Sequence, residues 1–198
     1  MTWDHRNHTL FVYQATSKIS ILKNFNGTFD EHTEFEDIRT GVSQGYGSVA
    51  FDWISGNLYW TDSFHNWIAM QPAYIKDESM FKIIVSDGLR RPEGLAIDPL
   101  ARYMFWSDKE TRYGIIERST LSGTDRKIIA FQSLRRIFSM VADVYKQMLY
   151  WVDNLRDTLE TCDYNGLNRR VIDRTRRSYP TSVDISSVCI NRIYCRGI

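Results

Sequence analysis

The side chains that most often catalyse reactions or bind metals are few and scattered in this sequence. The four histidines lack the spacing of metal ligands: His5, His8, His32 and His65. The sequence contains no His-Glu-x-x-His motif, no phosphate-binding glycine loop and no nucleophile elbow. The glycines between Gly41 and Gly47 lead into a strand pattern, so we interpret them as a loop. We therefore predict no catalytic residue, no metal and no cofactor, and we do not expect an enzyme.

Repeated arginine pairs point to a second kind of chemistry, the binding of carboxylates. The pairs lie eight and seven residues before Asp98, Asp143 and Asp184: Arg90 and Arg91, Arg135 and Arg136, and Arg176 and Arg177. Arginine binds carboxylates through parallel hydrogen bonds and is enriched, with tryptophan and tyrosine, in protein-binding hot spots. Alternatively, the arginines stabilise connections between structural units by contacting backbone carbonyls.

Composition and charge restrict the kind of partner. The chain has 198 residues and a formal net charge of +1, with a balance of −5 over residues 1–87 and +6 over residues 88–198. Acidic residues are interspersed with the basic ones throughout, so we expect no nucleic-acid binding. No run approaches the ~20 apolar residues of a membrane helix. Membrane attachment is therefore expected only through other parts of a longer parent protein.

An internal repeat determines the expected fold. The segment 49–62 recurs as 95–108 and again as 140–153, and the closing aspartates are 46 and 45 residues apart. In each copy a first aspartate precedes an aromatic pair by seven residues, as Asp52 precedes Tyr59. Each period contains four short strand patterns separated by turn residues, which is typical of a β-propeller with one four-stranded blade per repeat.

The repeated motif at the end of each segment has a structural interpretation. Its members are Tyr59, Trp60, Thr61 and Asp62, then Phe105, Trp106, Ser107 and Asp108, then Tyr150, Trp151, Val152 and Asp153. Successive strand residues face opposite sides, so both rings can be buried between neighbouring blades. The aspartates are expected to tie a turn or a neighbouring strand by hydrogen bonds.

These motifs resemble the YWTD (class B) repeats of the low-density-lipoprotein receptor family. The resemblance implies an all-β propeller of six four-stranded blades in an extracellular receptor or matrix protein. We expect three complete blades at residues 46–85, 92–130 and 138–173, with partial blades at 9–38 and 180–198. A six-bladed ring needs about 250 residues, so an incomplete propeller, part of a longer protein, is expected. In the last copy, Ile193-Tyr194-Cys195 would restore the motif, with Cys195 in place of the tryptophan.

The arginine pairs and the loops between second and third strands are expected to share one face of the propeller. This basic face is the predicted ligand-binding site, formed by Arg90, Arg91, Arg112, Arg135, Arg136, Arg156, Trp67 and Tyr113. His65 lies in one of these loops and would make binding depend on pH between about 5 and 7. The expected partner is an acidic or extended extracellular protein, or a neighbouring module of the same receptor.

Two further residue types bear on the cellular location. Asn7 and Asn26 begin N-glycosylation triplets, which a secreted protein would use. Cys162 falls within a strand pattern and is predicted to be a buried, inert thiol. Cys189 and Cys195 form a disulfide or begin a cysteine-rich module.

The resemblance implies a ligand-binding segment of an endocytic or signalling receptor, on the extracellular side of the cell surface. The alternative is a structural module of a nidogen-like matrix protein. A propeller hydrolase would need carboxylates that converge on a central metal. The aspartates instead recur at the same position in every repeat, which argues against that class.

Overall fold

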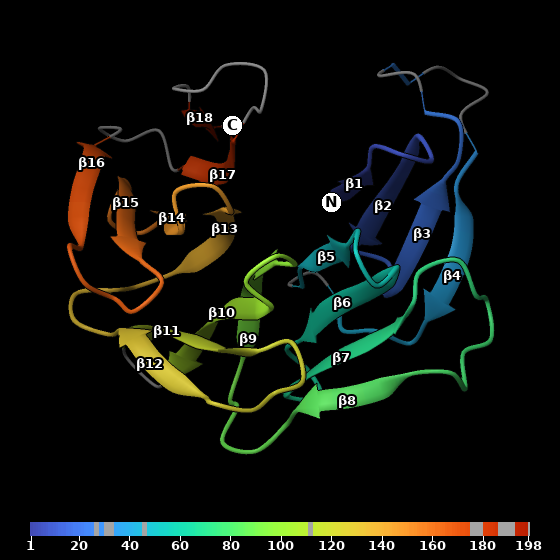
Figure 1. Cartoon of the computed structure of the whole chain (residues 1–198), viewed down its shortest axis with the longest axis horizontal. Helices are drawn as coiled ribbons and strands as arrows, with labels where there is room; N and C mark the ends of the chain where they lie inside the picture. The colour runs from blue at the N-terminus through green and yellow to red at the C-terminus, as the bar shows by residue number, and fades with distance from the viewer. Residues whose placement is uncertain are drawn as a thin grey trace.

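The computed structural model describes residues 1–25, 28–29, 34–44, 47–110, 113–174, 180–185 and 193–197. The described residues form only β-strands and connections, and none of them belongs to a helix able to span a membrane. Four sheets of four antiparallel strands lie side by side in an arc, followed by a two-stranded sheet (Figure 1). The chain is thus an all-β propeller with blades built from consecutive strands.

The strands of each blade follow one another from the inside of the arc to the outside. Blade 1 contains β1 (Thr2–Asp4), β2 (Thr9–Gln14), β3 (Lys18–Leu22) and β4 (Glu36–Thr40). Blade 2 contains β5 (Val49–Asp52), β6 (Asn57–Asp62), β7 (Trp67–Pro72) and β8 (Lys82–Val85). Blade 3 contains β9 (Pro92–Asp98), β10 (Tyr103–Glu110), β11 (Tyr113–Thr120) and β12 (Lys127–Ala130). Blade 4 contains β13 (Ile137–Asp143), β14 (Met148–Asp153), β15 (Thr158–Asp163) and β16 (Arg170–Arg174). The two-stranded sheet contains β17 (Pro180–Ile185) and β18 (Ile193–Gly197).

The number of complete blades expected from the sequence is wrong. Blade 1 is complete because β1 pairs with β2, placing Trp3 opposite Leu10. Strand β1 was not predicted from sequence because it is only three residues long and because Phe-Val-Tyr-Gln replaces the motif on β2. The seven-residue spacing from Asp4 to Phe11 is nevertheless that of the other repeats.

The expected alignment of the last repeat is also wrong. Strand β18 pairs with β17 so that Cys195 lies opposite Val183. In blade 4 the equivalent pair is Leu149 opposite Ala142. Cys195 therefore takes the position before the aromatic pair and does not replace the tryptophan, because the connection between β17 and β18 is longer than in the other blades.

The aromatic pair forms the contacts between blades. Trp106 is fully buried against blade 2, in a cluster that includes Ile68. Phe105, its neighbour on β10, is fully buried on the opposite side of the strand. It packs in a cluster with Leu134, which lies in the connection to blade 4, and with Trp151 of blade 4. Alternation along the strand thus sends the tryptophan to the preceding blade and the first aromatic to the following one. The predicted burial of the motif tryptophans is confirmed in blades 2, 3 and 4.

Turn glycines complete the packing between the outer strands. Gly166 has a φ of +82°, and a Cβ at this position would collide with the carbonyl oxygen of Ile129 on β12 of blade 3. Gly56 has a similar φ of +72°, but no atom lies within 4 Å of its Cβ position. Gly166 therefore meets both a backbone and a packing requirement, whereas Gly56 meets only the first.

Replacing Gly166 with alanine is expected to lower the free energy of unfolding by about 2–4 kcal/mol, from left-handed backbone strain and overpacking. The matched Gly56→Ala change should cost about 1–2 kcal/mol, from strain alone. Urea unfolding curves of both variants measure the difference. Equal losses in the two variants would contradict the close packing of Gly166 against blade 3.

Candidate functional site

The closing aspartates hold the arginine pairs by their backbone. The Asp108 carboxylate accepts hydrogen bonds from the backbone N–H groups of Arg90 (3.0 Å) and Arg91 (2.6 Å). Asp153 accepts in the same way from Arg135 (2.7 Å) and Arg136 (3.2 Å). The connections into blades 3 and 4 therefore lie on the same rim as the ends of β10 and β14, as the sequence predicts. We call this rim, with the connections 88–91 and 133–136 and the described parts of the loops after β6, β10 and β14, the arginine rim.

Two closing aspartates, Asp62 and Asp153, also order the loop that follows them. Asp153, which is fully buried, accepts a third hydrogen bond from the Leu155 N–H group (3.2 Å). In blade 2, the Asp62 carboxylate accepts hydrogen bonds from the N–H groups of Phe64 and His65. Burial raises the pKa of Asp153, and its hydrogen bonds to the backbone oppose this shift. The motif aspartates are thus turn-forming residues and not a set of free carboxylates.

The third motif position links blade 2 to blade 3 and blade 3 to blade 4. Thr61 accepts a hydrogen bond from the Ser48 N–H group (2.9 Å) and donates one to the carbonyl oxygen of Glu93 (2.7 Å). Ser107 repeats the arrangement between Gly94 (2.8 Å) and Ile137 (2.7 Å). A hydroxyl can donate and accept at once, which explains threonine or serine at this position.

Val152 lacks the hydroxyl that links the other blades. In blade 4 the hydroxyl of Ser139 forms the link to the next sheet instead, because it accepts a hydrogen bond from the Val183 N–H group (3.0 Å). The link between blade 4 and the two-stranded sheet therefore comes from β13, not from the motif.

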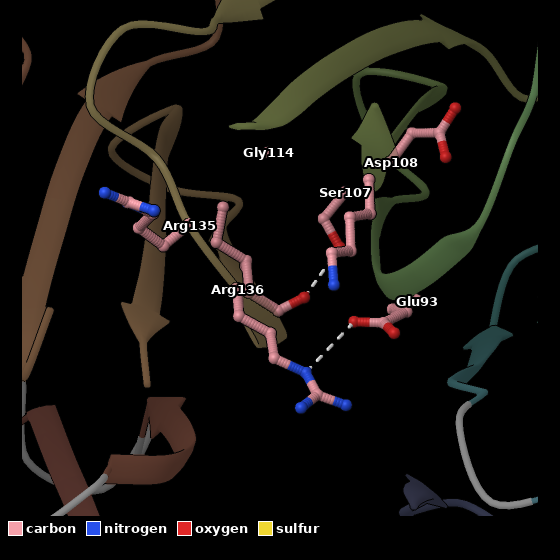
Figure 2. Close-up of a pocket in the computed structure, with 8 residues that line it drawn as sticks. Glu93, Ser107, Asp108, Gly114, Arg135 and Arg136 are labelled. Atoms are coloured by element: carbon pink, nitrogen blue, oxygen red, sulfur yellow. Dashed lines mark hydrogen bonds and ion pairs between the residues drawn. The ribbon is translucent and has the colours of Figure 1, made fainter. Parts of the chain in front are cut away.

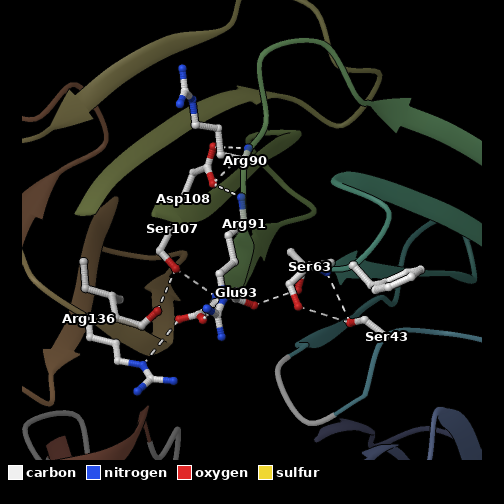
Figure 3. A network of polar contacts seen from close by, with 12 residues as sticks. Ser43, Ser63, Arg90, Arg91, Glu93, Ser107, Asp108 and Arg136 are labelled. Atoms are coloured by element: carbon white, nitrogen blue, oxygen red, sulfur yellow. Dashed lines mark hydrogen bonds and ion pairs between the residues drawn. The ribbon is translucent and has the colours of Figure 1, made fainter. Parts of the chain in front are cut away.

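The two arginines of each pair have different surroundings. Arg90 and Arg135 are exposed, and the Arg135 guanidinium lies 5.8 Å from the centre of the Tyr113 ring. The second members, Arg91 and Arg136, reach toward the carboxylate of Glu93 (Figure 3). Consecutive residues of an extended segment point in opposite directions, which separates the two side chains of each pair.

Glu93 is the polar residue on which the second arginines converge. Its side chain is only 4% exposed, with Oε1 2.9 Å from Arg91 Nε and Oε2 3.9 Å from Arg136 Nε. Burial raises the pKa of Glu93, and the charges of Arg91, Arg136 and Lys109 oppose the shift. Beside it lies a small pocket between blades 3 and 4 (Figure 2), which is lined by Glu93, Ser107, Asp108, Lys109, Gly114, Arg135, Arg136 and Ile137.

The other predicted site residues are only partly available on the surface. Arg156 turns back to the Ser133 carbonyl oxygen, and its Nη1 lies 4.0 Å from a carboxylate oxygen of the buried Glu160. Trp67 is half-buried and stacks on His65, with 4.5 Å between the ring centres. Tyr113 is 55% exposed. Arg112 lies outside the described residues, as do Arg176 and Arg177.

His65 is held by the closing aspartate of blade 2. Its Nδ1 lies 3.0 Å from Asp62 Oδ2, and its side chain is 37% exposed. The predicted pH dependence of binding through His65 therefore concerns a histidine that is paired with a buried carboxylate.

Sequence reasoning missed Glu93 and a second set of arginines. Arg126 pairs with both carboxylate oxygens of Glu117 (2.6 and 2.7 Å), and its guanidinium covers the ring of Trp106 at 5.4 Å. Arg169 takes the equivalent position in blade 4, where its Nε and Nη2 both donate to Oε2 of Glu160 and its guanidinium covers the ring of Trp151. These two Glu–Arg pairs could have been found from the sequence, because they are 43 residues apart and so recur with the blades. Glu93 has no equivalent in the repeat and gave no such signal.

The cysteines and glycosylation triplets have the following positions. Cys162 is fully buried as predicted, and burial raises the pKa of its thiol to about 12. Cys189 lies outside the described residues, and the side chain of Cys195 is not described. The Asn7 amide donates to Asp4 (2.8 Å) and to the Tyr74 hydroxyl (3.3 Å). Asn26 lies outside the described residues, so glycosylation at both positions stays a prediction.

The described part of the chain contains no group of three or more His, Cys, Asp or Glu side chains that could hold a metal ion.

Comparisons with known proteins fit this geometry. No protein-family model matches the chain. A chain from a crystal structure of a nidogen/laminin complex superposes with a TM-score of 0.76 at 28% sequence identity, covering 88% of this chain and 65% of that one. This chain folds as a YWTD-type β-propeller.

Curated relatives of this propeller carry the name Protein cueball. The protein from Drosophila sechellia is 26% identical over 155 residues, which cover 77% of this chain and 24% of that protein. The protein from Drosophila persimilis is 24% identical over 191 residues, which cover 94% of this chain and 28% of that protein. The propeller therefore spans about a quarter of the length of these relatives. Together with the nidogen/laminin likeness, they indicate an extracellular or matrix protein.

Proposed function

We propose that the arginine rim binds an acidic, extended segment of another extracellular protein. The observation that carries this proposal is the equivalent placement of Arg90 and Arg135, two exposed guanidinium groups on successive blades. Asp108 and Asp153 hold the backbone of both connections, so little conformational entropy is lost on binding. Exposed Tyr113 lies beside Arg135 and adds an aromatic contact surface.

The solved neighbour supports the class of partner without identifying it. It comes from a complex of nidogen with laminin, so a similar fold occurs in a protein–protein assembly. We propose binding, not catalysis, for this chain as well.

We propose that the propeller belongs either to a lipoprotein-receptor-type endocytic or signalling receptor or to a nidogen-like matrix protein. The nidogen/laminin likeness favours the matrix setting. We also propose that the four blades belong to a six-bladed ring. The matched part is 65% of the neighbour's chain, close to the share of about two thirds that four of six blades would occupy.

The test compares binding by charge-reversed variants of the full chain. We expect the double variant Arg90→Glu, Arg135→Glu to bind peptides rich in aspartate and glutamate at least tenfold more weakly than the unmodified chain, because like charges then face each other. The matched control is Arg102→Glu, Arg170→Glu, which makes the same charge change at exposed positions away from this rim. Binding to an array of fluorescent 12-residue peptides, measured at two salt concentrations, reads out the effect.

The outcome that overturns the proposal is equal affinity and equal salt dependence for the rim variant and the unmodified chain. Arg91 and Arg136 are left intact in this test because their charges are shared with the Glu93 carboxylate, whereas the test concerns the two exposed arginines.

A further inference from the structure

Glu93 joins three blades at the arginine rim. Its own strand, β9, belongs to blade 3, and its carbonyl oxygen accepts the hydrogen bond from Thr61 of blade 2. Its carboxylate lies between Arg91, from the connection into blade 3, and Arg136, from the connection into blade 4. Figure 3 shows both side chains directed toward Glu93, while Arg90 points away from it.

This arrangement divides the positive charge of the rim into two parts. Arg91 and Arg136, with side chains 38% and 25% exposed, share the negative charge of one carboxylate that is itself 4% exposed. Arg90 and Arg135 are exposed, and within the described residues it is their backbone N–H groups that bind carboxylates. A low-dielectric position strengthens the interaction between Glu93 and the second arginines.

Two classes of acidic ligand respond differently to such a division. A sulfated polysaccharide binds through many cations at once, with little geometric requirement, and each neutralised charge adds to the salt dependence by counterion release. A peptide carboxylate needs one well-placed guanidinium with its parallel donors. A buried carboxylate within a basic surface therefore weakens the binding of sulfated polysaccharides more than the binding of peptide carboxylates. Lowering the affinity for an unwanted partner in this way is a means of specificity.

We propose that Glu93 sets the partner class of the arginine rim. Its negative charge offsets the positive charges of Arg91 and Arg136, so that these two arginines add little to the attraction of polyanions. The rim therefore selects polypeptide carboxylates over sulfated polysaccharides. The preference for carboxylates rests on the proposed function, whereas the weak binding of polyanions does not.

The first experiment uses heparin as the polyanion probe and the full chain as the protein. We expect Glu93→Gln to bind heparin about 3- to 10-fold more tightly at 50 mM salt. The slope of log affinity against log salt should become steeper by about one to two, because up to two additional cations contribute. The double variant Glu93→Gln, Arg136→Gln has the net charge of the unmodified chain and should return to its heparin affinity. Unchanged heparin binding by Glu93→Gln would overturn the proposal.

A second pair of variants keeps Glu93 in place and tests the same division. One double variant carries Arg90→Gln and Arg135→Gln, and the other carries Arg91→Gln and Arg136→Gln. Both remove the same charge from the same rim. The first should lower the salt slope for heparin by about two, and the second by less than one. Equal losses would show that Glu93 does not offset the charges of its arginines, and would overturn the proposal even if Glu93→Gln fails to fold.

The peptide array separates this inference from the proposed function. If the rim binds no acidic peptide while Glu93→Gln still gains heparin affinity, the proposed function fails and the exclusion of polyanions by Glu93 stands. If acidic peptides bind through Arg90 and Arg135 while Glu93→Gln leaves heparin affinity unchanged, the proposed function stands and the role of Glu93 is only to join the blades.

Discussion

Replacing Trp106 with alanine is expected to lower the free energy of unfolding by about 3–5 kcal/mol. The side chain is fully buried where blade 3 meets blade 2, in contact with the cluster that contains Ile68 and Val85. Truncation removes this apolar contact and leaves a cavity that the strands on either side cannot close. It also uncovers the guanidinium of Arg126, which lies 5.4 Å from the indole ring.

The measurement is urea unfolding followed by circular dichroism, so that loss of the tryptophan does not affect the signal. Trp53→Ala is the matched control, since Trp53 is 37% exposed in the turn between β5 and β6 and should cost less than about 1 kcal/mol. A loss below 1 kcal/mol for Trp106→Ala would contradict its role between the blades. Ready quenching of Trp106 fluorescence by iodide would contradict its burial.

Replacing Asp153 with alanine should cost about 3–4 kcal/mol, and the effect should be centred on the arginine rim. The fully buried carboxylate accepts hydrogen bonds from the N–H groups of Arg135, Arg136 and Leu155. Alanine leaves these three donors without their acceptor, and each partly buried donor without a partner costs about 1 kcal/mol or more. We therefore expect the connection into blade 4 to lose its fixed conformation before the rest of the blade unfolds.

Amide hydrogen exchange tests this local effect. The amides of Arg135 and Arg136 should exchange roughly 100- to 1,000-fold faster in Asp153→Ala, as expected if the loss of about 3–4 kcal/mol is local to this connection. Asp173→Ala, at an exposed position on β16, should leave them unchanged. If exchange at the connection is the same in both variants, Asp153 does not hold the arginine pair.

The pH dependence of Asp153 adds a second check. Because burial raises its folded-state pKa above the ordinary value of 3.8, the folded state binds the proton more readily than the unfolded state. Its contribution to the free energy of unfolding therefore falls as the pH rises from 3.8 to the raised pKa. Asp153→Asn should remove that part of the slope, and an unchanged slope in this variant would contradict the assignment.

The parts of the fold that depend on neighbouring residues in the chain were predictable from sequence. The repeat of the closing aspartates at 46 and 45 residues marks the blades, and strand alternation places Tyr59 and Trp60 on opposite sides. Blade 1 was underestimated because a three-residue strand carries almost no pattern, and only its pairing with β2 shows that it completes the sheet.

The sequence alone determined that this protein is a YWTD-type propeller and that arginine pairs recur in front of its blades. These properties follow from spacing along the chain, since hydrophobic alternation and turn-forming aspartates act over a few residues. Only the tertiary structure decided that Arg90 and Arg135 are exposed while Arg91 and Arg136 approach Glu93. The physical reason is that the surroundings of Glu93 come from three different blades, so its burial and its charge partners exist only once those blades have packed together.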